Sequence, residues 1–294
     1  MWQADTFDPV TIERELGWAS DLCFNTTRVY LHDLVWENDS SRFIERINRF
    51  LEIASSKGIK PMFVFFDDCW NSVFLPGKQP EPKPGVHNSG WVQSPGPSRV
   101  LDPSTWGPLE DYVKGVLTAF GDDDRVLLWD LYNEPGGFTK DTQSLGLLKE
   151  VFKWAREVNP FQPISVGVWF ENAEFNDFQL SNSDIVTFHN YHDAGNLEEQ
   201  IHRLKEHGRP MICTEYMART NGSLFETKLP VFKRENVGCI NWGLVDGKTQ
   251  TKYPWGSEEG SPEPELWFHE IFHRDGTPYR KDEVDLIRKL TGSE

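Results

Sequence analysis

The chain has 294 residues, and its hydrophobic (38%) and aromatic (13%) fractions are large enough for an extensive buried core. The net charge of −16 argues against nucleic acid or an anionic membrane surface as partner, because both need clustered Lys and Arg, and a neutral substrate fits better. No apolar run approaches the length of a spanning helix, and residues 1–20 lack the basic start and apolar stretch of a signal peptide, so we expect a soluble chain.

Short β-branched or aromatic runs alternate with amphipathic stretches along most of the chain. In chain order the pattern predicts helix 11–23, strand 25–32, helix 41–56, strand 60–67, helix 108–120, strand 126–132, helix 144–158, strand 164–170, a weakly helical piece, strand 184–191, helix 197–206, strand 210–216, helix 224–234, strand 238–245 and C-terminal helices.

Strands that alternate with helices indicate an α/β fold with a parallel sheet and right-handed crossovers. A doubly wound open sheet and a closed barrel both satisfy this pattern. A barrel needs eight strands, whereas the pattern predicts seven, and only residues 1–10 precede the first helix. We therefore expect residues 1–10 to be the trailing loop of a lacking or truncated first strand. A gap or a makeshift filling is then expected between strands 25–32 and 238–245.

Residues 69–105 form the longest predicted irregular segment and are rich in Pro, Gly, Ser and Trp. Loops of this length are usually functional or disordered, and the aromatic content favours a folded loop that walls a cleft. Burial of any one of these aromatics beneath the loop is an equally good interpretation. No segment has the composition of a linker, so we expect one domain over residues 1–294.

Two predicted strands end in carboxylates. Glu134 stands in W-D-L-Y-N-E-P and Glu215 in I-C-T-E-Y, and the active sites of parallel α/β barrels gather at the carboxyl ends of strands. Glycoside cleavage needs one carboxyl that protonates the leaving oxygen and another that attacks or stabilises C1. The two Glu residues are therefore candidates for this pair, and a separation of about 5–5.5 Å would make the reaction retaining. Taken alone, either Glu is far more typical of a solvated carboxylate at a strand end.

The motifs WDLYNEP, FHNYH, ICTEY and INWG resemble strands four, six, seven and eight of the clan A glycoside hydrolases, and TTRVYLHDLVW resembles strand two. The cellulase-like family five is the most similar, and the resemblance covers nearly all of residues 10–250. It implies a (β/α)8 TIM barrel and a retaining β-glycosidase that acts on an oligo- or polysaccharide. It does not specify the sugar, the linkage or the oligomeric state. Such proteins are often exported, which implies secretion or a periplasmic location if the native N-terminus is missing.

By this resemblance Glu134 is the general acid/base and Glu215 the nucleophile. Asn133 is expected to hydrogen-bond the sugar 2-OH, and His189 and Tyr191 are expected to line the site. In the family an aromatic residue at this place orients the nucleophile, and a histidine contacts the acid/base or the sugar.

Other residues are candidates for substrate binding. The same resemblance implies that Trp242 lies under the sugar, where an indole face suits the apolar face of a β-sugar. The charge of Arg28 needs a partner on its apolar strand, and Glu215 and Asp130 are equally good candidates.

Three further candidates for substrate contact lie at or just after the ends of strands 25–32 and 60–67. His32 closes the strand that carries Arg28 and is a candidate for substrate contact, with a capping or core role as the alternative. Asp68 follows strand 60–67 and is a candidate for hydrogen bonds to sugar hydroxyls. Trp70 belongs to the long loop and is a candidate for its cleft wall.

We expect no metal or other cofactor. His192 and Asp193 are possible ligand types, but His189 and His192 alternate onto opposite strand faces and no H-E-x-x-H occurs. The four cysteines have no metal-ligand spacing. A carbohydrate-binding barrel without turnover is the main alternative function, and a metal-dependent barrel hydrolase is the third.

Overall fold

The computed structural model describes residues 1–137 and 140–292. The chain divides into two compact units. Unit 1 comprises Met1–Leu16, Asn25–Gln79 and Val92–Ile185, and unit 2 comprises Gly17–Phe24, Pro80–Trp91 and Val186–Glu294. None of the helices in the described ranges combines the length and the apolar character that a membrane span requires.

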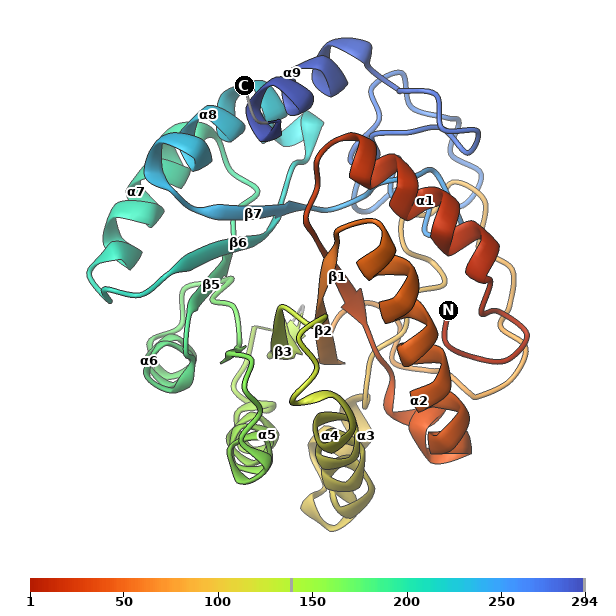
Figure 1. The fold of residues 1–294 in the computed structure, drawn as a ribbon, viewed down its shortest axis with the longest axis vertical. Helices are drawn as coiled ribbons and strands as arrows, with labels where there is room; N and C mark the ends of the chain where they lie inside the picture. The colour runs from red at the N-terminus through yellow and green to blue at the C-terminus, as the bar shows by residue number, and fades with distance from the viewer. Residues whose placement is uncertain (138–139, 293–294) are drawn as a thin grey trace. The chain divides into compact units, whose positions relative to one another are not determined.

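Unit 1 is built on a four-stranded parallel sheet (Figure 1). Its strands lie in the order β1 (Thr26–Tyr30), β2 (Lys60–Asp67), β3 (Leu128–Asn133) and β4 (Ile164–Ser165). β2 is buried along its whole length after Lys60. Such a continuous apolar run is typical of a parallel strand covered on both faces.

Helices follow the strands of unit 1. They are α2 (Asp33–Ser56), the short α3 (Pro97–Val100), the 3-10 turn η1 (Pro103–Thr105), α4 (Gly107–Phe120), α5 (Leu145–Val158) and α6 (Ala173–Asn182). α2 packs against β2 and α4, and α4 packs against α5. The apolar side chains of α5 recur at helical spacing and are buried, and the helix ends at Asn159 in the left-handed conformation.

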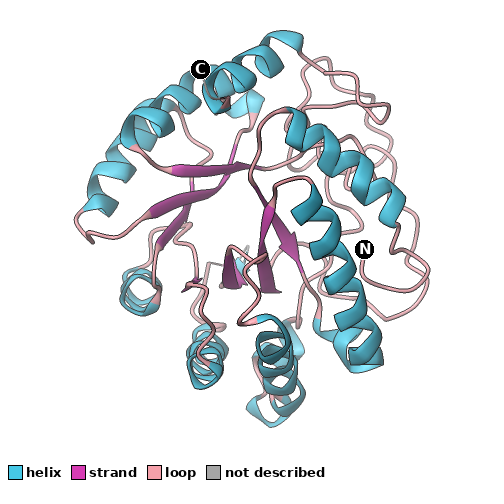
Figure 2. Cartoon of the chain, in the orientation of Figure 1, coloured by secondary structure: helices cyan, strands magenta, loops and turns pink. Residues whose placement is uncertain are grey.

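The described part of unit 2 contains a three-stranded parallel sheet, and the alternation of strand and helix is visible in Figure 2. Its elements are β5 (Val186–His189), α7 (Ala194–Lys205), β6 (Met211–Tyr216), the 3-10 turn η3 (Arg219–Asn221), α8 (Phe225–Glu235), β7 (Gly238–Asn241) and α9 (Lys281–Thr291). α8 packs against α7, α9 and β7. The remaining helix, α1 (Pro9–Asp21), begins in unit 1 and ends in unit 2.

The predicted alternation is confirmed, with a strand at each of the seven predicted places in the described chain. β4 is shorter than predicted, because side chains satisfy the backbone that follows it. The Ser183 hydroxyl accepts from Val166 N (3.1 Å), and Gln179 Nε2 donates to Gly167 O (3.0 Å). These contacts replace strand pairing after Ser165.

The predicted helix 41–56 begins earlier, at Asp33, and is interrupted at Asp39, whose φ of −164° is not helical. Asp39 Oδ1 accepts from Arg42 N at 3.0 Å. Asp39 therefore caps a second helical segment, and the prediction located only that segment.

Residues 1–8 contain no strand, and α1 begins at Pro9, two residues before the predicted start of the first helix. Trp2 is buried instead, and its indole N–H donates to Tyr30 O at 2.7 Å. The expected filling between strands 25–32 and 238–245 stays a prediction.

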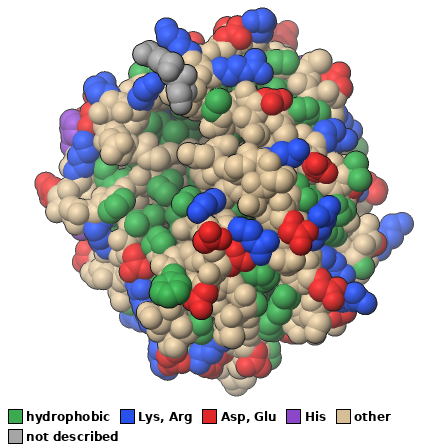
Figure 3. Space-filling model, in the orientation of Figure 1, with side chains coloured by type: hydrophobic (Ala, Val, Ile, Leu, Met, Phe, Trp, Pro, Cys, Tyr) green, Lys and Arg blue, Asp and Glu red, His purple; other side chains and the backbone are tan. Residues whose placement is uncertain are grey.

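Acidic and basic side chains are mixed on the face shown in Figure 3. No continuous Lys and Arg patch is visible among the described residues on this face, and such a patch is what an extended phosphate backbone would need.

Glu270 is a fully buried carboxyl group of unit 2. Its Oε1 accepts from the Thr251 hydroxyl at 2.6 Å, and its Oε2 has no hydrogen-bond partner in the described part of the chain. Burial, which penalises the ionised form, raises the pKa of Glu270 to about 7.

This pKa predicts a pH-dependent stability. The folded-state pKa of about 7 lies above the ordinary value of 4.5. The stability that is linked to protonation of Glu270 is therefore fully present below pH 4.5 and is lost as pH rises through 7. We expect Glu270→Gln to raise the free energy of unfolding by about 1–3 kcal/mol at pH 8 and to change it little at pH 4. Urea unfolding at the two pH values measures this difference, with Glu259→Gln at an exposed position as the control. Equal effects of Glu270→Gln at both pH values would contradict the prediction.

Candidate active site

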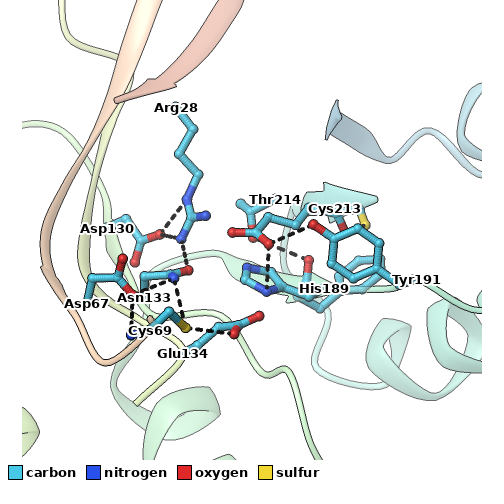
Figure 4. Close-up of polar contacts among 12 residues, drawn as sticks. Arg28, Asp67, Cys69, Asp130, Asn133, Glu134, His189, Tyr191, Cys213 and Thr214 are labelled. Carbon is cyan, nitrogen blue, oxygen red and sulfur yellow. Dashed lines mark hydrogen bonds and ion pairs between the residues drawn. The ribbon is translucent and has the colours of Figure 1, made fainter. Parts of the chain in front are cut away.

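A buried ion pair joins the middle of β1 to the middle of β3 in unit 1. Arg28 Nε and Nη2 donate to Asp130 Oδ2 at 2.9 and 2.6 Å, and the two side chains are 4% and 1% exposed (Figure 4). The pairing of Arg28 with Asp130 is therefore confirmed. Arg28 Nη2 also donates to Asn133 Oδ1 at 2.7 Å, which fixes the orientation of the Asn133 amide.

Glu134 directly follows β3 and has a φ of +43°, a left-handed conformation that is strained for a non-glycine residue. The next turn holds it in place, because Gly137 N donates to Glu134 O at 2.9 Å. A Cβ atom on Gly137 would lie 2.7 Å from Asp68 O, so the turn needs glycine there.

Asp68 supports the same turn. Its carboxylate accepts from the Tyr132 hydroxyl (2.7 Å), from Gly136 N (2.9 Å) and from the Ser144 hydroxyl. Burial raises the pKa of Asp68 and outweighs the opposing effect of these donors. The structure therefore assigns Asp68 a supporting role, and its predicted contact with sugar stays a prediction.

The capping interpretation of His32 is confirmed. His32 Nδ1 accepts from Leu34 N at 3.2 Å at the start of α2, and Nε2 lies 3.1 Å from Gln93 O. Trp70 is half-buried, with a φ of +69°. Substrate contact by His32 or Trp70 remains a prediction.

In unit 2, Glu215 lies near the end of β6 and is 6% exposed. Tyr191 donates its hydroxyl to Glu215 Oε2 at 2.9 Å, and His189 Nδ1 lies 3.6 Å from the same oxygen (Figure 4). The backbone of β5 also holds this residue, because Asn190 N donates to Glu215 O at 3.0 Å. One carboxylate oxygen thus faces a phenol and an imidazole.

A β-bulge sets this geometry. Phe188 pairs with Cys213, but the next residue, His189, pairs with Glu215, so Thr214 is an extra residue in β6. Thr214 donates its hydroxyl to Phe188 O at 3.3 Å. The sequence pattern does not reveal the bulge, because Thr is common in regular strands.

Lys228 is a buried residue of α8 that the sequence reasoning missed. Its Nζ donates to both the backbone oxygen and Oδ1 of Asn190, each at 2.6 Å, and burial lowers the pKa of Lys228 to about 8. Lys228 therefore anchors the residue that lies between His189 and Tyr191. The only sequence signal is a lysine on the apolar face of an amphipathic helix.

Two pairs of aromatic residues pack together in unit 2. Trp242 follows β7, is half-buried, and packs edge to face with Trp91 at a centroid distance of 5.3 Å. Trp255, which the sequence reasoning also missed, packs on Tyr191 at 4.9 Å and is 43% exposed. His87 belongs to the long irregular segment 69–105 and is buried. Burial beneath the loop was the alternative to a place in a cleft wall.

The fold is similar to those of solved barrel glycoside hydrolases. The endo-1,4-β-mannanase from Rhizomucor miehei gives a TM-score of 0.66 at 14% identity, over 99% of this chain and 92% of that chain. The endo-β-1,4-mannanase from Thermotoga petrophila gives 0.65 at 16% identity, over 97% and 73%. A β-glucosidase gives 0.62 at 14% identity, over 96% and 87%. The fold class is therefore the α/β TIM barrel, and not the doubly wound sheet.

Comparison with curated proteins returned no match. A family model described as cellulase, glycosyl hydrolase family 5, matches residues 24–248, which include both candidate carboxylates. The chain therefore belongs to the cellulase family, glycosyl hydrolase family 5, and it is a glycosidase.

Proposed function

We propose that the chain is a retaining β-glycoside hydrolase that cleaves O-glycosidic bonds of an oligo- or polysaccharide by double displacement. The observation that carries the proposal is the hydrogen bond from the Tyr191 hydroxyl to Glu215 Oε2. A phenolic donor fixes the direction of the carboxylate, as a carboxylate nucleophile requires. We assign Glu215 as this nucleophile.

Glu134 is the proposed acid/base. It stands at the end of a different strand, and its Oε2 lies 3.0 Å from the Cys69 thiol, a weaker donor than a phenol. Two carboxylates in different environments can take different protonation states and roles.

The proposed reaction has two steps. In the first, Glu134 gives its proton to the glycosidic oxygen while Glu215 attacks C1, so that the C1–O bond breaks and a glycosyl ester forms. In the second, Glu134 takes a proton from water, the water oxygen bonds to C1, and Glu215 leaves as a carboxylate. The product keeps the β configuration.

Other residues are proposed to bind the sugar. The Asn133 amide is suited to the 2-OH, where hydrogen bonds strengthen in the transition state, and the Trp242 face is suited to the apolar side of the ring. We propose β-1,4-linked mannan as the first substrate to test, because two of the similar structures are endo-β-1,4-mannanases.

Hydrolysis of β-mannan, β-glucan, xylan and galactan, together with aryl β-glycosides, tests the proposal. We expect turnover of at least one substrate, with the β anomer as the first product in proton NMR, and loss of turnover in the Glu134→Gln, Glu215→Gln double variant. An α anomer as first product would exclude retention. Binding without any turnover would favour the carbohydrate-binding alternative, and loss of activity with a chelator would favour a metal-dependent hydrolase.

A further inference from the structure

Cys69 lies between two residues of the proposed site. It follows β2, is 5% exposed, and donates its thiol hydrogen to Glu134 Oε2, with 3.0 Å between sulfur and oxygen (Figure 4). Its backbone is fixed by Asp67, because Cys69 N donates to Asp67 Oδ1 at 2.9 Å. The sulfur is therefore held at a defined place beside the Glu134 carboxyl group.

The neighbouring hydrogen bonds set the direction of the thiol hydrogen. Asn133 Oδ1 accepts from Arg28, so the amide nitrogen of Asn133 faces the opposite way. That nitrogen donates to Asp67 Oδ1 at 2.9 Å and lies 3.8 Å from Cys69 Sγ, where it can only donate. With a donor already directed at the sulfur, the thiol hydrogen points to Glu134.

From this geometry we propose that Cys69 is a positioning residue that orients the Glu134 carboxyl group toward the glycosidic oxygen. The inference rests on the proposed acid/base role of Glu134. A thiol suits this task, because Glu134 must carry a proton in the first step and none in the second. The S–H donor can orient the carboxyl group in both states, because Oε2 accepts whether or not the other oxygen carries the proton.

The effect should depend on the leaving group. A misoriented acid slows only those reactions that need a proton, so Cys69→Ala should lower kcat/KM for a phenyl β-glycoside by about 3- to 10-fold. The same variant should change kcat/KM for a 2,4-dinitrophenyl β-glycoside by less than about 2-fold, because this leaving group needs little protonation. The ratio of the two values does not depend on the fraction of folded protein.

Cys69→Ser is the matched variant, since it differs from Cys69→Ala by one hydroxyl donor. We expect Cys69→Ser to bring the ratio of kcat/KM for the phenyl glycoside to kcat/KM for the dinitrophenyl glycoside most of the way back to the value of the unmodified chain. Cys23→Ala, at an exposed position, should leave this ratio unchanged. An equal loss on both substrates, no loss on either, or a Cys69→Ser ratio no better than that of Cys69→Ala would overturn the inference.

Glu134→Ala, measured on the same two substrates, separates this inference from the proposed function. If Glu134→Ala is selectively impaired on the phenyl glycoside and Cys69→Ala is not, only the role of Cys69 is wrong. If Glu134→Ala shows no such selectivity, the acid/base assignment fails and the role of Cys69 fails with it.

Discussion

Glu215→Ala should lower turnover of an activated aryl β-glycoside by on the order of 10⁴-fold or more, because it removes the group that forms the covalent intermediate. Azide or formate should restore part of the activity, since a small anion fits the space left by the carboxylate and can attack C1. Attack by azide from that side inverts the configuration once. The expected product is therefore the α-glycosyl azide, which NMR identifies.

Glu206→Ala provides a control at an exposed position of the same unit, and we expect it to retain full activity without an azide product. A β-glycosyl azide from Glu215→Ala would show that another group still forms the intermediate. That result would remove Glu215 from the nucleophile role.

The second large effect is expected for Glu134→Ala. Substrates with poor leaving groups should lose about 10²- to 10⁴-fold in kcat/KM, the usual contribution of a general acid. A 2,4-dinitrophenyl β-glycoside should still form the glycosyl-enzyme, because its leaving group needs no proton. Deglycosylation then lacks its base, so azide should accelerate turnover and give the β-glycosyl azide.

The control for this variant is Glu174→Ala, which removes an exposed carboxylate from unit 1. It should show neither leaving-group selectivity nor azide acceleration. If Glu215→Ala gave the β-glycosyl azide and Glu134→Ala gave the α-glycosyl azide, the roles of the two residues would be reversed.

The order of the structural elements could be predicted because its signals are local. Apolar runs such as Lys60–Asp67 and the helical spacing of Leu145–Val158 depend on neighbouring residues, and both elements were found where the pattern placed them. The strand-end positions of Glu134 and Glu215 followed from the same patterns together with the flanking motifs. Element ends were less predictable, because side chains such as Ser183 and Asp39 ended or interrupted regular hydrogen bonding.

The contacts of the candidate site depended on residues far apart in the chain. Arg28 had two equally good partners in the sequence, and the structure shows its pairing with Asp130, 102 residues away. The thiol of Cys69 reaches Glu134 because β2 and β3 are neighbours in the sheet. Their register pairs Asp67 with Asn133, so the residues that follow these two strands lie close together.

The amino-acid sequence by itself determined the alternation of elements, the two strand-end carboxylates and the motifs of the family. Only the tertiary structure decided how each carboxylate is held. The bulge at Thr214 pairs His189 with Glu215, whereas period-two alternation contains no such shift. Lys228 reaches Asn190 from a helix 38 residues further along the chain. Such contacts arise when packed strands and helices bring distant side chains within hydrogen-bonding distance, and no local sequence pattern encodes that distance.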